Sequence, residues 1–165
     1  MQTISSPGPS PASRRAARVQ RLERSTWIPR PVGEVHLFFA DITNLQRITP
    51  PELRFRIVTP VPVEMRTGAL IDFQLSLFGM PFRWHTEISS WDPPHRFVDR
   101  QLAGPYAQWV HLHEFVSERD GTRMRDAVDY TLPLGVLGLA ALPLVRRELE
   151  RIFDFREAAI TQLLS

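Results

Sequence analysis

The segment WVHLHEF, residues 109–115, places two histidines two positions apart between two aromatic residues. In a β-strand, alternate side chains project from the same face of the sheet. Trp109, His111, His113 and Phe115 would therefore share one face. Two imidazoles on a common face suit four roles: metal ligands, acid–base catalysts, the polar part of a ligand cavity, or buried members of an ordinary core.

The turns on either side of this strand predict which other polar groups join the histidines. A tight turn at residues 119–121 pairs the strand with one expected over 122–132, and a reversal near Pro105 pairs it with one expected over 95–102. The side chains that these registers add to the histidine face are Phe97, Asp99, Gln101, Asp126, Val128 and Tyr130. Because an unpaired buried polar group costs about 1–3 kcal/mol, such a face predicts a polar network, a water-filled pocket or both.

The composition excludes several kinds of chemistry. The chain has no cysteine and no lysine, so thiolate nucleophiles, Schiff bases and a P-loop lysine are ruled out. At 165 residues, with 43% apolar and 23% charged residues, it is typical of one soluble globular domain. The catalytic motifs G-x-S-x-G and H-E-x-x-H do not occur.

The basic charge gathers at the amino-terminal end. Residues 1–18 are rich in Arg, Pro and Ser without apolar periodicity, which predicts a disordered tail followed by a single domain over 19–165. The remainder is mildly acidic, so we expect no nucleic-acid partner. The longest uncharged run, 132–145, is too short to span a bilayer. We therefore expect a cytoplasmic protein without stable membrane insertion, with at most transient surface contact through the arginines.

The hydrophobic pattern predicts an α+β fold. A strand over 20–29 is followed by two short helices, the first beginning after Pro31 and the second capped by Thr43 or Asn44. Further strands are expected over 53–59, 69–78, 81–91, 95–102, 108–118 and 122–132, and a long helix over about 143–164. The strands alternate polar and apolar residues, so we expect an antiparallel meander whose covered face packs against the final helix. The uncharged run before that helix is either part of its packed beginning or a mobile apolar lid.

Several short runs resemble the SRPBCC superfamily, which includes START-type, birch-pollen-allergen-like and polyketide cyclase/dehydratase-like proteins. The runs are WHTEI (84–88), WDPP (91–94), FVD (97–99), GPY (104–106), WVHLHEF (109–115) and DAVDYTLP (126–133). The resemblance covers about 20–164 and is greatest to small bacterial ligand-binding members. It implies the helix-grip fold, a curved antiparallel sheet wrapped around a long C-terminal helix with an apolar cavity between them. It implies function only weakly, because many activities share this fold.

We interpret the chain as a binder of a small hydrophobic ligand, such as a lipid, an isoprenoid or a polyketide-like compound. The expected ligand-binding residues are Trp84, Phe97, Asp99, Gln101, Trp109, His111, His113, Phe115, Val128 and Tyr130. An alternative is a cyclase or dehydratase that uses His111, His113, Asp126 and Tyr130 in acid–base catalysis without a covalent intermediate. A second alternative is a protein-interaction module that modulates a partner enzyme. We assign no cofactor and no metal, because H-x-H is common by chance and the resemblance brings no metal; the oligomeric state stays open.

Overall fold

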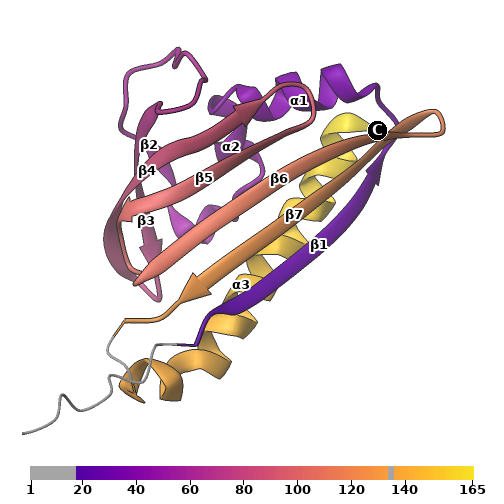
Figure 1. Ribbon diagram of the computed structural model, residues 1–165. Helices are drawn as coiled ribbons and strands as arrows, with labels where there is room; N and C mark the ends of the chain where they lie inside the picture. Colours follow the sequence, from indigo (N-terminus) through magenta and orange to yellow (C-terminus); the bar gives the residue numbers. More distant parts are fainter. Residues whose placement is uncertain (1–17, 134–135) are drawn as a thin grey trace, which may run out of the picture.

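The computed structural model describes residues 18–133 and 136–165 (Figure 1). Seven antiparallel strands form one sheet in the order β1-β7-β6-β5-β4-β3-β2. The strands are β1 (Gln20–Ile28), β2 (Arg56–Ile57), β3 (Leu70–Leu77), β4 (Met80–Asp92), β5 (Arg96–Ala103), β6 (Gln108–Glu118) and β7 (Gly121–Thr131). The predicted meander is confirmed. The predicted tail over 1–18 lies, except for Arg18, outside the described residues.

One predicted strand is much shorter than expected. The segment 53–59 contributes only the two residues of β2, because Pro51–Leu53 form a short 3₁₀ helix and Arg54 ends it in the left-handed region with φ 47°. A left-handed residue interrupts an extended strand. The residues just before β2 therefore pack over the sheet and do not extend its edge strand.

Two short helices follow β1, as predicted: α1 (Val32–Ala40) and α2 (Thr43–Arg47). The predicted cap of α2 was wrong, since neither Thr43 nor Asn44 supplies it. The carboxylate of Asp41 accepts hydrogen bonds from the Thr43 backbone N–H at 2.9 Å and from its hydroxyl at 2.6 Å. This side chain satisfies donors at the helix start that have no partner within the helix.

The C-terminal helix, α3 (Val136–Leu164), begins about two turns earlier than expected and includes Pro143. A proline inside a helix removes one hydrogen bond and costs about 3 kcal/mol. Leu142 and Val145 on either side of it pack against the buried cluster that contains Trp109 and Tyr130. We attribute the longer helix to this packing, which favours burial of the apolar segment over its local preference.

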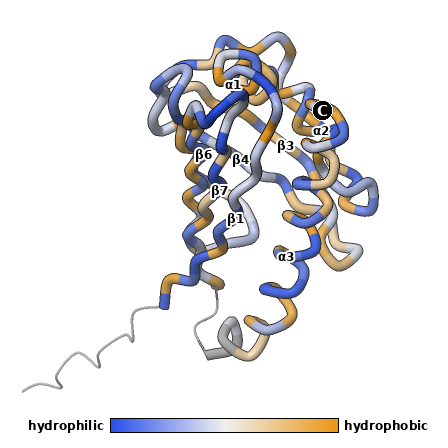
Figure 2. The backbone as a smooth tube through the Cα atoms, turned by 90° about the vertical axis from the view of Figure 1, so that its right-hand side faces the viewer, coloured by the Kyte–Doolittle hydropathy of each residue, from blue (hydrophilic) through white to orange (hydrophobic). Residues whose placement is uncertain are grey.

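The strand registers place the histidines on the concave face, as predicted. In β6, His111 lies opposite Val128 of β7 and Asp99 of β5, while His113 lies opposite Asp126 and Phe97. Figure 2 shows hydrophilic and hydrophobic residues alternating along the adjacent strands β6, β7 and β1. The α+β helix-grip fold is therefore confirmed, with α3 lying against the concave face of the curved sheet (Figure 1).

The turn between β6 and β7 holds this register. Arg119 adopts the left-handed region with φ 55°. Gly121 starts β7 beside the end of β1, with which β7 pairs in the sheet. A side chain at Gly121 would collide with the backbone carbonyl of Ile28 and with the Trp27 ring. Glycine is therefore required here for close approach, and the tight turn fixes which residues of β7 face the histidines.

No helix in the ranges 18–133 and 136–165 combines the length and the apolar composition needed to cross a bilayer.

Candidate functional site

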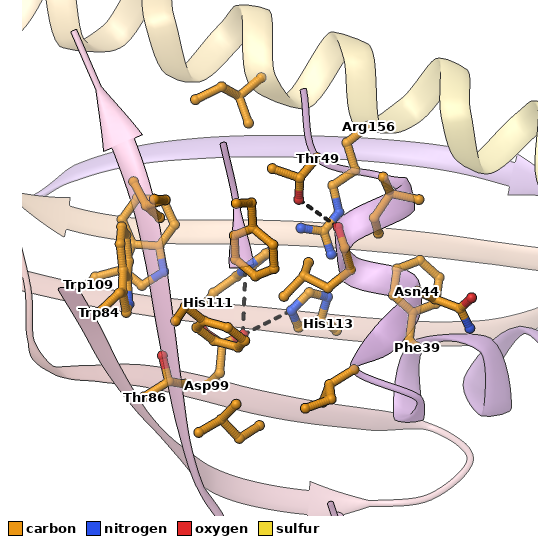
Figure 3. Close-up of a pocket in the computed structure, with 18 of the residues that line it drawn as sticks. Phe39, Asn44, Thr49, Trp84, Thr86, Asp99, Trp109, His111, His113 and Arg156 are labelled. Carbon is orange, nitrogen blue, oxygen red and sulfur yellow. Dashed lines mark hydrogen bonds and ion pairs between the residues drawn. The ribbon is translucent and has the colours of Figure 1, made fainter. Parts of the chain in front are cut away.

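A cavity of about 180 Å³ lies between the concave face of the sheet, the α1–α2 segment and α3. Aromatic and aliphatic side chains form most of its wall. Polar side chains gather at one end, where Asp99, His111 and His113 meet Arg156 from α3 (Figure 3). The hydrophobic wall includes Phe39, Trp84, Phe97, Trp109 and Phe153.

Two aspartates and two histidines form a compact group that we name the His–Asp cluster: Asp99, His111, His113 and Asp126. Asp126 Oδ1 lies 3.0 Å from His111 Nε2 and 2.8 Å from His113 Nδ1. Asp99 Oδ2 lies 3.0 Å from His113 Nε2 and 3.6 Å from His111 Nδ1. The ring centroids of the histidines are 3.8 Å apart. Each imidazole therefore has one nitrogen toward Asp126 and the other toward Asp99.

These four contacts are of three kinds. The His111 Nε2 contact with Asp126 and the His113 Nε2 contact with Asp99 are hydrogen bonds in which the imidazole donates. The His113 Nδ1 contact with Asp126 is an ion pair without the alignment of a hydrogen bond. At 3.6 Å, His111 Nδ1 and Asp99 are too far apart for a hydrogen bond.

Burial and charge set the protonation of the cluster. Burial and the charge of His113 lower the pKa of His111, so this ring is neutral. Burial alone would also lower the pKa of His113, but Asp126 and Asp99 outweigh it and raise the pKa. Burial alone would raise the pKa of Asp126, yet Arg156 and the two histidines hold it well below its ordinary value.

The pKa of Asp99 is lowered in the same way, because the two histidines outweigh the effect of burial. The two carboxylates are therefore held as anions, and the Arg156 guanidinium and the two imidazoles face them as compensating groups. A buried group of this kind is tolerated only when its charges compensate one another.

Sequence reasoning missed Arg156. Its Nε lies 3.7 Å from Asp126 Oδ2, and its guanidinium lies 5.8 Å from the ring centroids of both Phe39 and Phe153. The side chain is only 11% exposed, and Nε has no hydrogen-bond partner among the described residues. A signal was present, since Arg156 falls three residues after Phe153 and four before Ile160, on the apolar stripe of the helix.

Six of the ten predicted ligand-binding residues line the cavity, and four do not. Those in its wall are Trp84, Phe97, Asp99, Trp109, His111 and His113. The Gln101 amide instead donates to the Tyr106 carbonyl at 2.7 Å. Phe115, Val128 and Tyr130 are buried among hydrophobic neighbours, because the middle of β7 and the end of β6 lie where α1 and α3 pack directly on the sheet.

The residues predicted for catalysis can also be compared with those that line the cavity. Asp126 does not reach the cavity but contacts both histidines that do. The segment between β1 and β3 adds wall residues that the sequence analysis did not anticipate, including Phe39, Asn44 and Thr49 (Figure 3).

A second cavity, of about 210 Å³, lies near the first turns of α3. Its walls are apolar and include Phe78, Phe82 and Leu132. Leu77, Tyr106 and Ile152 line both cavities and therefore lie between them.

Solved structures with the same architecture were found, all at low sequence identity. The aromatase/cyclase ZhuI from Streptomyces sp. R1128 has a TM-score of 0.71 and 17% identity, over 89% of this chain and 94% of that one. Protein Ms6760 from Mycobacterium smegmatis has a TM-score of 0.64 and 19% identity, over 87% and 90%. The ginseng major latex-like protein 151 from Panax ginseng has a TM-score of 0.54 and 13% identity, over 85% and 96%.

No protein-family model and no curated protein sequence matches the chain. The solved structures confirm the fold that the SRPBCC resemblance implied. At this identity the similarity carries the architecture and not the ligand or the activity.

Proposed function

We propose that the protein binds a small hydrophobic ligand that carries a polar group. The observation that supports this most is the cavity, whose wall is mostly apolar and whose charged and imidazole groups Asp99, His111, His113 and Arg156 gather at one end (Figure 3). Aromatic walls provide most of the binding energy in such sites, and a few polar groups orient the ligand. Lipids, isoprenoids and polyketide-like compounds all combine a hydrophobic body with a polar group.

The size of the cavity restricts the ligand. An apolar cavity of about 150 Å³ holds one benzene molecule, so the 180 Å³ here suits a compact ligand of one or two rings. A longer ligand would also need the second cavity, which lies behind Leu77, Tyr106 and Ile152.

Binding can be tested with a cavity-filling variant and a matched control on the same strand. Ile71 lines the cavity, whereas the adjacent Leu70 is 52% exposed on the other face of β3. Native mass spectrometry would detect a co-purified ligand. Displacement of prodan, a fluorescent probe with one naphthalene ring system and a ketone, by decanoic acid, farnesol and 2-naphthol would rank the three ligand classes.

We expect Ile71→Phe to weaken probe binding at least about tenfold, since added volume in a packed wall leaves no room for the probe. Leu70→Phe should bind as the wild type does. Absence of both a co-purified ligand and probe binding in the wild type would contradict the proposal, as would an equal loss in the two variants.

A second candidate is acid–base turnover of the bound ligand, as in a cyclase or dehydratase. It is supported by His111, which donates to Asp126 through Nε2 while its other nitrogen has no hydrogen bond and borders the cavity. The carboxylate fixes the tautomer that such a base requires. Tyr130 has little support as a partner because it does not line the cavity.

His111→Gln distinguishes turnover from binding alone. If the ligand is converted, this variant should retain probe binding and lose at least about a hundredfold of the rate with a poly-carbonyl substrate. Unchanged conversion would exclude His111 as the base.

A further inference from the structure

We propose that Asp99, His111 and His113 bind a divalent first-row transition-metal ion, such as zinc, at the polar end of the cavity. One carboxylate oxygen and two imidazole nitrogens lie within 4.8 Å of one another. They come from the neighbouring strands β5 and β6 (Figure 3). The metal site does not depend on the proposed ligand, and its test uses the metal alone.

Two of the three distances between the donor atoms are close to those around a bound zinc ion. Asp99 Oδ2 lies 3.0 Å from His113 Nε2 and 3.6 Å from His111 Nδ1. Ligands placed tetrahedrally at ~2.0–2.1 Å from zinc are separated from one another by roughly 3.3 Å. The observed values lie on either side of this separation. The longer one is no hydrogen bond, so hydrogen bonding alone does not explain why His111 Nδ1 faces Asp99.

Asp126 supplies the second observation. It contacts His111 through Nε2 and His113 through Nδ1, which are the two nitrogens that face away from Asp99. A carboxylate on the outer nitrogen fixes a metal-binding histidine in the tautomer whose lone pair faces the metal. Here a single buried carboxylate contacts the outer nitrogen of both rings, through a hydrogen bond at His111 and an ion pair at His113. The inner nitrogens of both rings face the same Asp99 oxygen.

The remaining neighbours complete this arrangement. Arg156 lies nearest the second oxygen of Asp126, at 3.7 Å, and its charge holds this carboxylate as an anion in the outer position. Phe97 stacks on the His113 ring with centroids 4.2 Å apart and thereby restricts its rotation. Rigid support of this kind maintains ligand geometry.

Three protein ligands leave at least one coordination position open. Asp99, His111 and His113 all border the cavity, whereas Asp126 lies behind them. The open position therefore faces the cavity, where water or an oxygen of the ligand can occupy it. Two histidines with one carboxylate and an open position are the ligand set of catalytic zinc and non-haem iron sites. When the metal is bound, it replaces the proton on His113 Nε2.

Titration with Co²⁺ tests the site, because its visible absorption reports the coordination geometry. The protein is first treated with a chelator and dialysed, and Zn²⁺ is then added as a competitor. We expect one Co²⁺ per chain, absorption typical of four or five ligands, and displacement by Zn²⁺. Asp99→Asn and His113→Gln should abolish this absorption. Asp126→Asn should weaken the affinity about 10–100-fold, as an outer-position carboxylate does.

The matched control is His85→Gln, which removes the histidine of an exposed His–Asp pair on β4 and should leave binding unchanged. Circular dichroism checks that each variant folds. If the cluster variants do not fold, X-ray absorption of the Co²⁺-loaded wild type decides, since two imidazole ligands are expected. No stoichiometric binding, a spectrum without imidazole ligands, or equal loss in His85→Gln would overturn the proposal.

Discussion

The sheet carries two His–Asp arrangements, one on each face. On the outer face, His85 Nδ1 of β4 lies 2.6 Å from Asp72 Oδ1 of β3, and the side chains are 35% and 53% exposed. On the concave face, the His–Asp cluster has contacts of 2.8–3.0 Å, yet its histidine side chains are only 4% and 6% exposed. The outer contact is the shorter one.

This difference shows that distance does not determine the energetic importance of such a pair. Exposed ion pairs contribute about 0–1 kcal/mol, because water and salt screen them and the side chains lose entropy. The contribution of a buried charge to stability depends on its partners, since a charge left alone in the interior has no water to solvate it. The three predictions below test whether the two sites differ as this argument requires.

Removal of one carboxylate from each site should give the largest difference. Asp126→Asn leaves His113 and Arg156 facing a neutral amide in the interior, and we expect it to lower the free energy of unfolding by about 3–5 kcal/mol. Asp72→Asn should change it by less than about 0.5 kcal/mol. Urea denaturation followed by circular dichroism measures both. Similar losses in the two variants would refute the distinction.

Double-mutant cycles should show a smaller effect of the same sign. For Asp99 and His113, which share a buried hydrogen bond, we expect a coupling energy of about 1–3 kcal/mol. For Asp72 and His85 the coupling should be below about 0.5 kcal/mol. The four single and two double variants are compared by thermal unfolding at pH 7. A coupling at the outer pair as large as the inner one would contradict the argument.

Lowering the pH should distinguish the two sites by a smaller change in the free energy of unfolding. The pKa values of Asp126, Asp99 and His111 are lowered in the folded protein. The unfolded chain therefore binds more protons as the pH falls below about 6.5, and stability declines. His113, whose pKa is raised, contributes stability below about pH 6.5 and loses it only as the pH rises above that value.

We thus expect the urea midpoint of the chelator-treated protein to fall between pH 6.5 and 4.5. Asp72→Asn should retain this dependence, whereas Asp126→Asn should steepen it, because Asp126 opposes the lowering of the pKa of both histidines by burial. A midpoint independent of pH in the wild type would show that the cluster is not ionised as described.

The sequence allowed the sheet and the face of each cluster residue to be predicted, because alternation and tight turns fix strand register. Asp99, His111, His113 and Asp126 were placed together correctly for this reason. The directions of the imidazole nitrogens depend on side-chain rotamers, which no spacing encodes. The convergence of two imidazole nitrogens on Asp99 was therefore not predictable.

Contributions from outside the sheet were also missed. Arg156 lies on a helix whose rotation relative to the sheet is set only by packing. Asn44 lies within the short helix α2, and Thr49 follows that helix. The length of α3 was underestimated because the helix was expected to begin at Pro143, whereas burial of the neighbours of this proline outweighs its local cost within the helix.

The side chains between the two cavities have a consequence for selectivity. The residues that line both cavities come from three separate parts of the chain. They are Leu77 in β3, Tyr106 in the β5–β6 connection and Ile152 in α3. None of them belongs to the His–Asp cluster. Under the proposed function, these three residues would limit the length of the ligand, whereas the His–Asp cluster and Arg156 would hold its polar group. Substitutions at the three residues should then change the accepted length without changing the charged end.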